Sequence, residues 1–113
     1  MIKNATRARY VSRSFVRDSE ESRRHRGLIS ELAGAYHRSG FKVKADHVPD
    51  FESPEKISMI FPDIIAVKNG KKIVVEVETR SSRGSERDKR QQKVFGNWAK
   101  KDRRRDFRRE LTI

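Results

Sequence analysis

The feature that most constrains the fold is a pair of apolar runs within residues 61–78, joined by Asn69-Gly70. An Asn-Gly pair between two such runs is the strongest short-range signal for a β-hairpin, and it favours a two-residue type I′ turn. Counting outward from that turn places Asp63 directly opposite Glu76. The sequence therefore predicts two strands that bring two carboxylates face to face.

A third carboxylate belongs to the same sheet face. Glu78 shares this face with Glu76 because side chains along a strand alternate with a period of two. Opposed like charges destabilise a sheet, and burying a carboxylate is costly unless it is compensated. A divalent metal such as Mg²⁺ would compensate this cluster. The other face is apolar and is predicted to be core; it carries Ile64, Ala66, Ile73, Val75 and Val77.

An ordinary explanation of the same pattern is a solvated strand face. Alternating glutamates often lie in water, where Lys72 and Arg80, on the same face by parity, would pair with them for little net energy. The directly opposed Asp63 favours the metal site over this alternative.

Charge is distributed unevenly along a chain whose formal net charge is +12. Residues 41–79 carry six basic and seven acidic residues, whereas residues 80–110 carry thirteen basic and five acidic ones. Basic residues also dominate the first 17 positions. Basic flanks around an acidic, strand-rich centre indicate a protein that binds a polyanion.

Several classes of protein are disfavoured by composition. The chain has no cysteine, so a disulfide framework and a thiolate zinc site are excluded, and its three histidines are scattered. No apolar run approaches membrane-spanning length, and the N-terminus lacks the apolar core of a signal peptide. We therefore expect a cytoplasmic protein with no membrane partner.

The chain divides into a basic N-terminal arm, residues 1–18, and a single domain, residues 19–113. Helical spacing of Leu28, Ile29, Leu32 and Tyr36, with Ser39-Gly40 as a stop, predicts the first helix. The later elements are expected at about 41–48 (strand), 57–67 and 71–79 (hairpin strands), 85–103 (helix) and 107–113 (a short final strand). The second helix would bury Val94, Phe95, Trp98 and Ala99. The order predicts an α/β fold: a helix, three strands, a helix and a possible strand.

Two glutamates of the first helix are candidates for the site. Helical periodicity places Glu21 on the face of Leu28 and Leu32, where it would point toward the sheet, whereas Glu31 lies on the flank of the apolar stripe. Ordinary surface charge is the alternative for either residue.

Pro62-Asp63 before one strand and Glu76-Val-Glu78 on the next resemble the PD-(D/E)xK nuclease superfamily, over about residues 19–105. The nearest members in style are the archaeal Holliday junction resolvases. The resemblance implies a restriction-endonuclease-like fold with a mixed central sheet. It also implies hydrolysis of a phosphodiester bond with Mg²⁺ or Mn²⁺ bound by Asp63, Glu76 and the carbonyl of Val77.

The resemblance leaves two roles open. Glu78 stands where the family usually has a lysine, although some members have a glutamate there. Either a lysine of the second helix, Lys93 or Lys89, polarises the attacking water, or Glu78 is the general base. Resolvases of this fold also use a glutamate of the first helix, for which Glu31 and Glu21 are both candidates.

The implied partner is DNA, either duplex or branched, cut by a C2 homodimer with structure specificity rather than recognition of a long base sequence. The residues expected to hold its backbone are Arg7, Arg9, Arg13, Arg80, Arg83, Arg87, Arg90, Lys93, Lys100 and Lys101. The main alternative is a catalytically inactive nucleic-acid-binding protein on the same fold. A basic structural protein of a ribonucleoprotein is a third possibility.

Overall fold

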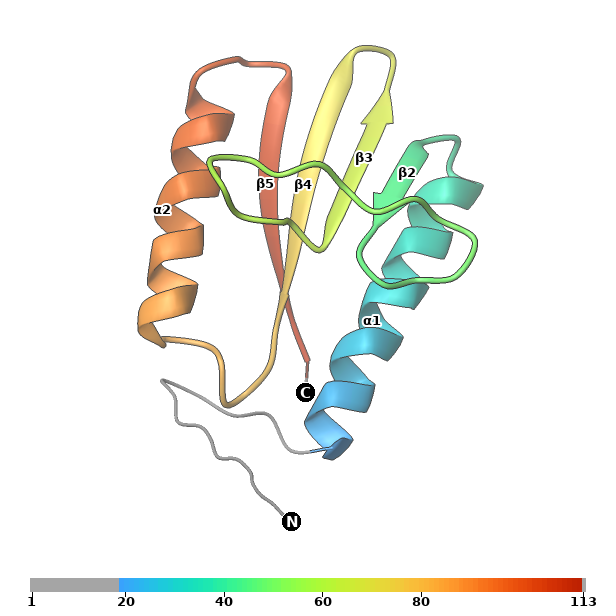
Figure 1. The fold of residues 1–113 in the computed structure, drawn as a ribbon. Coiled ribbons are helices and arrows are strands. Elements are labelled where there is room, and N and C mark those ends of the chain that lie inside the picture. Colours follow the sequence, from blue (N-terminus) through green and yellow to red (C-terminus); the bar gives the residue numbers. More distant parts are fainter. Residues whose placement is uncertain (1–18, 113) are drawn as a thin grey trace.

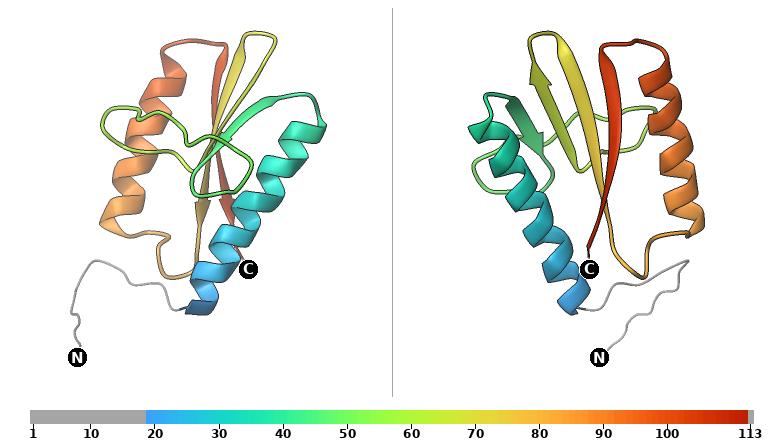
Figure 2. Two further views of the ribbon diagram at one scale, coloured as in Figure 1. Left: turned by 45° about the vertical axis from the view of Figure 1, so that its right-hand side comes forward. Right: turned by 180° about the vertical axis from the view of Figure 1, so that it is seen from behind.

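The computed structural model describes residues 19–112. The chain order is α1 (Ser19–Arg38), β2 (Lys42–Ala45), β3 (Ile64–Lys68), β4 (Lys71–Glu78), α2 (Glu86–Lys100) and β5 (Arg105–Leu111). Figure 1 shows α1 beside β2 and α2 beside β5, at opposite edges of the sheet. Residues 46–63, which connect β2 to β3, cross the sheet and reach α2, as the turned views in Figure 2 also show.

The four strands form one mixed sheet in the order β2-β3-β4-β5. β3 is antiparallel to both β2 and β4, whereas β5 is parallel to β4. The parallel pair is possible because α2 forms the crossover between its strands. The predicted α/β class, the element order and the mixed central sheet are confirmed, and the possible final strand is present.

The β3–β4 hairpin has the predicted register. Ile64 faces Val75, and the pairing continues to the pair of lysines that flank the turn. Asn69 and Gly70 have φ angles of 51° and 80°, the two positive values that a type I′ turn requires. The turn therefore fixes which residues share each sheet face.

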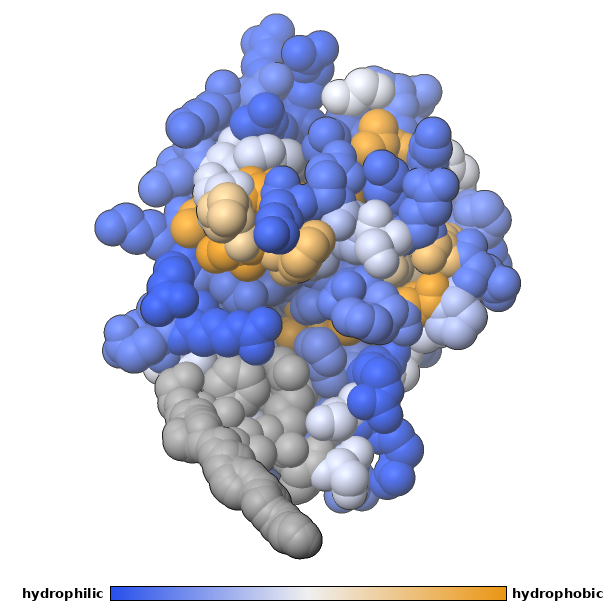
Figure 3. Space-filling view, viewed as in Figure 1, coloured by the Kyte–Doolittle hydropathy of each residue, from blue (hydrophilic) through white to orange (hydrophobic). Residues whose placement is uncertain are grey.

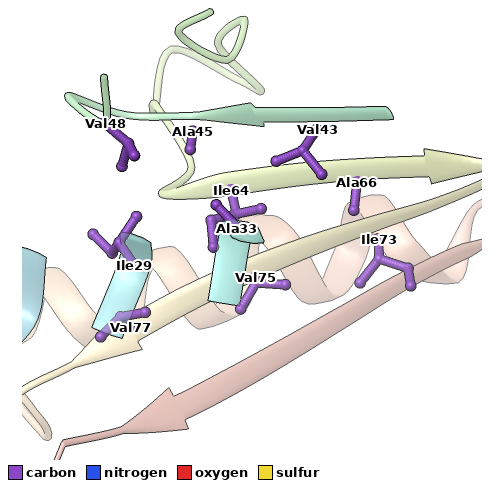
Figure 4. Packing of buried hydrophobic residues seen from close by; sticks show 10 residues of the cluster. All are labelled: Ile29, Ala33, Val43, Ala45, Val48, Ile64, Ala66, Ile73, Val75 and Val77. Carbon is purple, nitrogen blue, oxygen red and sulfur yellow. The ribbon is translucent and has the colours of Figure 1, made fainter. Parts of the chain in front are cut away.

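The sheet carries apolar side chains on both faces. On one face, Ile29 and Ala33 of α1 pack against the predicted core residues of the hairpin (Figure 4). On the other, Phe95 of α2 packs against Ile65 and Val74. The predicted apolar face is confirmed, and covering of the second face by α2 buries the carboxylate side of the hairpin as well.

Several predicted boundaries were wrong. The strand expected from residue 57 begins at Ile64, because Ser58 and Met59 adopt positive φ angles of 48° and 71° and form a turn. The strand expected over 41–48 ends at Ala45, and the second helix ends at Lys100 instead of 103. The last strand starts two residues earlier than expected.

The expected basic arm of residues 1–18, with Arg7, Arg9 and Arg13, lies outside the described residues.

Within residues 19–112, no helix is long and apolar enough to cross a membrane.

Candidate functional site

Two hydrogen bonds hold Asp63 and the β4 residues Glu76 and Val77 side by side at the end of the hairpin. The Asp63 backbone N–H donates a hydrogen bond of 2.7 Å to Glu76 Oε2, and the Val77 N–H donates one of 2.8 Å to Asp63 Oδ2. These two hydrogen bonds lie directly beyond Ile64 and Val75, the last residue pair of the β3–β4 ladder. Within the described chain, Asp63 Oδ1 and Glu76 Oε1 accept no hydrogen bond, so each carboxylate keeps one oxygen available.

The carboxylates of β4 are buried and form no salt bridge with another described residue. Glu76 and Glu78 are each 3% exposed, and neither forms a salt bridge within residues 19–112. Burial, with the neighbouring negative charge of Asp63, raises the pKa of Glu76 to about 9. Burial also raises the pKa of Glu78, against a 2.8 Å hydrogen bond from Ser82 Oγ. Within residues 19–112, the charges of Arg87 and Arg109 offset only part of the cost of burying these carboxylates, so the ionised cluster favours an added cation.

The first helix brings His25 to this site. His25 Nε2 lies 3.7 Å from Asp63 Oδ2, and both side chains are largely buried. His25 was not predicted as a site residue, although it lies one helical turn after Glu21 and therefore on the same face. That i, i+4 relation is the sequence signal that identifies it.

Neither of the two predicted glutamates of α1 lines the pocket that contains Asp63, Glu76 and Glu78. Glu21 accepts hydrogen bonds from Ser81 Oγ at 2.7 Å and from the Ser81 N–H at 3.3 Å, and the hydroxyl bond lowers its pKa. It thus holds the loop after β4, next to the carboxylates. Glu31 is exposed and borders a separate hollow beside Leu111 and Thr112. The structure does not bring Glu31 to the carboxylate pocket.

The start of α2 closes the site from the other side. Ser85 caps the helix by accepting the Asp88 N–H, and Asp88 is only 2% exposed. Its carboxylate accepts the Gly84 N–H at 2.7 Å and two bonds from Arg109 Nη2 of β5, at 3.0 and 3.2 Å. This buried pair ties α2 to the sheet behind the carboxylates. Sequence reasoning missed it because it assigned only apolar residues to the buried face of the helix.

The predicted basic residues within the described chain are all exposed. Of these, only Arg87 lines the carboxylate pocket, together with Gln91 one turn later. Lys93 and Lys89 do not line it, so no lysine occupies the place of the usual family lysine within residues 19–112. The remaining predicted residues, Arg80, Arg83, Arg90, Lys100 and Lys101, do not line this pocket.

The pocket formed by these groups is small. Its volume is about 30 Å³, and it is lined by His25, Asp63, Glu76, Glu78, Asp88 and neighbouring residues. This is room for an ion or a water molecule but not for a nucleotide. Among the described residues, no three His, Asp or Glu side chains are already arranged as a set of metal ligands. A metal here would therefore need further ligands from water or substrate, an arrangement usual for Mg²⁺.

The comparisons with known proteins agree with the fold and the motif. The sequence model of the restriction endonuclease-like, archaeal Holliday junction resolvase-like (AHJR-like) family matches residues 17–97, which include both helices' site residues and the hairpin. No curated protein gives a significant match. The match covers well over half of the chain and suggests nuclease activity. The chain therefore belongs to the AHJR-like family of the PD-(D/E)xK nuclease superfamily.

Proposed function

We propose that this protein is a metal-dependent DNA endonuclease in which Asp63 and Glu76 bind Mg²⁺ or Mn²⁺. The observation that carries the proposal is the close pairing of Asp63 with the buried Glu76, which forms no salt bridge within residues 19–112. A structural role alone does not require like charges at this position, where they destabilise the hairpin. A nuclease site does, because a divalent cation balances them.

The donor set fits such a metal. Each carboxylate uses one oxygen for a backbone N–H and keeps the other available. These two oxygens, with the backbone carbonyl of Val77, are hard ligands of the kind that Mg²⁺ and Mn²⁺ prefer. When bound, the metal would acidify water and stabilise charge that develops on the phosphate.

Glu78 is our candidate for the general base in place of the usual lysine. It lies on the same sheet face as Glu76, and one of its oxygens is held by the Ser82 hydroxyl. Its other oxygen accepts no hydrogen bond within the described chain, so it can take a proton from water. His25 would orient Asp63 from the side of α1. Lys93 and Glu31 have no equivalent position at the pocket.

Basic groups around the pocket would hold the DNA backbone. Arg87 borders the carboxylates, and the other exposed basic residues of 80–101 continue along α2. We further propose that residues 1–18 form a DNA-binding arm on a nuclease domain of residues 19–113. Symmetric cutting of two strands of branched DNA would require a C2 homodimer.

The alternative is a nucleic-acid-binding protein that has lost catalysis. The absence of a lysine among the described residues that line the pocket favours it. The two functions separate in one assay that uses labelled four-way junction, linear duplex, single-stranded DNA and RNA, with Mn²⁺ or with EDTA. A nuclease cuts DNA only with metal, and Asp63→Asn abolishes cutting. A protein that only binds leaves every substrate uncut, and Asp63→Asn leaves its affinity for nucleic acid unchanged or raises it.

A further inference from the structure

A second hollow adjoins the carboxylate pocket. It has a volume of about 290 Å³, and its wall is formed by Met59, Ile60, Phe61, Arg87, Arg90 and Gln91. Asp63 borders both spaces, so a group in this hollow would lie directly beside the proposed metal site. The proposed chemistry at the carboxylates does not use it.

The apolar wall comes from a tight turn that displays its tip to solvent. The N–H groups of Ile57 and Ile60 each donate to the other's carbonyl, at 2.8 and 3.0 Å, and both side chains pack on the core face of α2. Between them, Met59 has a φ of 71° and is 81% exposed. A positive φ is unfavourable for a residue with a long side chain, and such strain is typical of functional sites.

Large apolar side chains and cations occur together here. Phe61 is 51% exposed, and Lys56 Nζ lies 5.1 Å from its ring centroid. Arg87 and Arg90 face the same hollow from α2. Figure 3 shows a hydrophobic patch over this loop surrounded by hydrophilic side chains. An aromatic side chain can stack on a nucleobase, and nearby guanidinium groups can bind the phosphate attached to it.

We propose that this hollow binds one unpaired nucleobase next to the phosphate that is cut. This inference rests on the proposed DNA nuclease function. The base would stack against Phe61 and Met59, while Gln91, with Asp46 at the rim, offers hydrogen-bonding groups to its edge. The hollow lies just below the range of about 300–1,000 Å³ typical of small-molecule sites, a size suited to a single base and not to a base pair.

Selectivity for DNA structure follows from this pocket. A base within a continuous duplex must be unstacked and unpaired before it can enter, whereas a base at a branch point or mismatch enters at a lower cost. The basic residues that hold the phosphate backbone do not distinguish duplex from branched DNA in this way. The hollow thus gives the site a preference for branched or distorted DNA.

The test uses a branched DNA that carries 2-aminopurine at the base flanking the branch, with Ca²⁺ in place of Mg²⁺ so that cutting does not interfere. Wild-type protein is expected to change the fluorescence at least twofold. The double variant Met59→Ser/Phe61→Ser should leave the fluorescence near that of free DNA and bind branched DNA about tenfold more weakly. Its affinity for linear duplex should stay within about twofold.

Leu111→Ser is the matched control, because Leu111 is another exposed apolar side chain, at 44%, and lies outside the hollow. It should behave as wild type. Unchanged fluorescence and selectivity in the double variant would overturn the base pocket. So would loss of self-association in sedimentation without any change in fluorescence, because the patch would then be a subunit contact.

Failure of the nuclease proposal is distinguishable from failure of the pocket. If wild type never cuts DNA with Mg²⁺ or Mn²⁺ but its 2-aminopurine response depends on Met59 and Phe61, the base pocket stands and the nuclease does not. If it cuts but the response ignores both residues, only the pocket is refuted.

Discussion

Replacing Glu76 with Gln tests whether the buried carboxylate is held at a cost in the metal-free protein. Gln keeps the shape of the side chain and an oxygen that can accept the Asp63 N–H, and it removes the charge. In the unfolded chain Glu76 releases its proton near the ordinary value of 4.5, whereas in the folded protein its pKa is about 9. Between these values the unfolded state is the less protonated one, so wild-type stability falls as pH rises.

The magnitude follows from the same interval. Each pH unit within it removes at most about 1.36 kcal/mol of stability, so the full interval from 4.5 to about 9 sets an upper bound of about 6 kcal/mol. From pH 5 to pH 8 the bound is about 4 kcal/mol. We therefore expect Glu76→Gln and wild type to be similar at pH 5, and the variant to be more stable by about 1–4 kcal/mol at pH 8.

Urea denaturation in EDTA across pH 5–8 measures this difference. Glu31→Gln is the control, because Glu31 is exposed and outside the pocket, so that substitution reports the effect of net charge alone. Added Mn²⁺ should stabilise wild type but not the variant, by about 2.7 kcal/mol at a concentration 100 times the dissociation constant, and so should shrink or reverse the difference at pH 8. Parallel pH profiles for wild type and Glu76→Gln, or a variant that is less stable at pH 8, would refute the reasoning.

The other predictions concern the scaffold and the basic surface. Asp88→Asn and Arg109→Met should each lower the unfolding free energy by about 3 kcal/mol, because each strands a partly or fully buried charge, and the double variant should lose less than the sum. A double-mutant cycle in urea checks this. Phe95→Ala should lose about 3–5 kcal/mol through the cavity it leaves, measured in the same way. Arg90→Ala should reduce the slope of log K against log salt for DNA binding by about 1, measured by fluorescence anisotropy.

The carboxylate geometry was predictable because it depends on local turn chemistry. Asn69-Gly70 allows two consecutive positive φ angles, and that fixes the register from which the opposition of Asp63 and Glu76 follows. Element order was predictable for a similar reason: each helix has its own apolar periodicity, and the first has a stop signal at Ser39-Gly40.

The rest of the site depends on tertiary contacts that have no local signal. The buried Asp88 pairs with Arg109, which is 21 residues later in the sequence and lies on β5, the strand parallel to β4. α1 packs on the sheet face that lacks the carboxylates. His25 reaches Asp63 because α1 projects beyond the end of β3. The turn at Met59 resembles a strand in its apolar pattern, and its positive φ angles cannot be inferred from residue type.

The most direct measurement of the central claim is metal-dependent nicking of branched DNA by purified wild-type protein, Asp63→Asn and Glu76→Gln. The account predicts cutting by wild type with Mg²⁺ or Mn²⁺, none with EDTA, and a loss of at least about 100-fold in either variant, since removal of one essential charged group typically costs several kcal/mol of transition-state stabilisation. Both variants should still bind the DNA. Cutting by the variants at the wild-type rate, or no cutting by wild type with either metal, would contradict it.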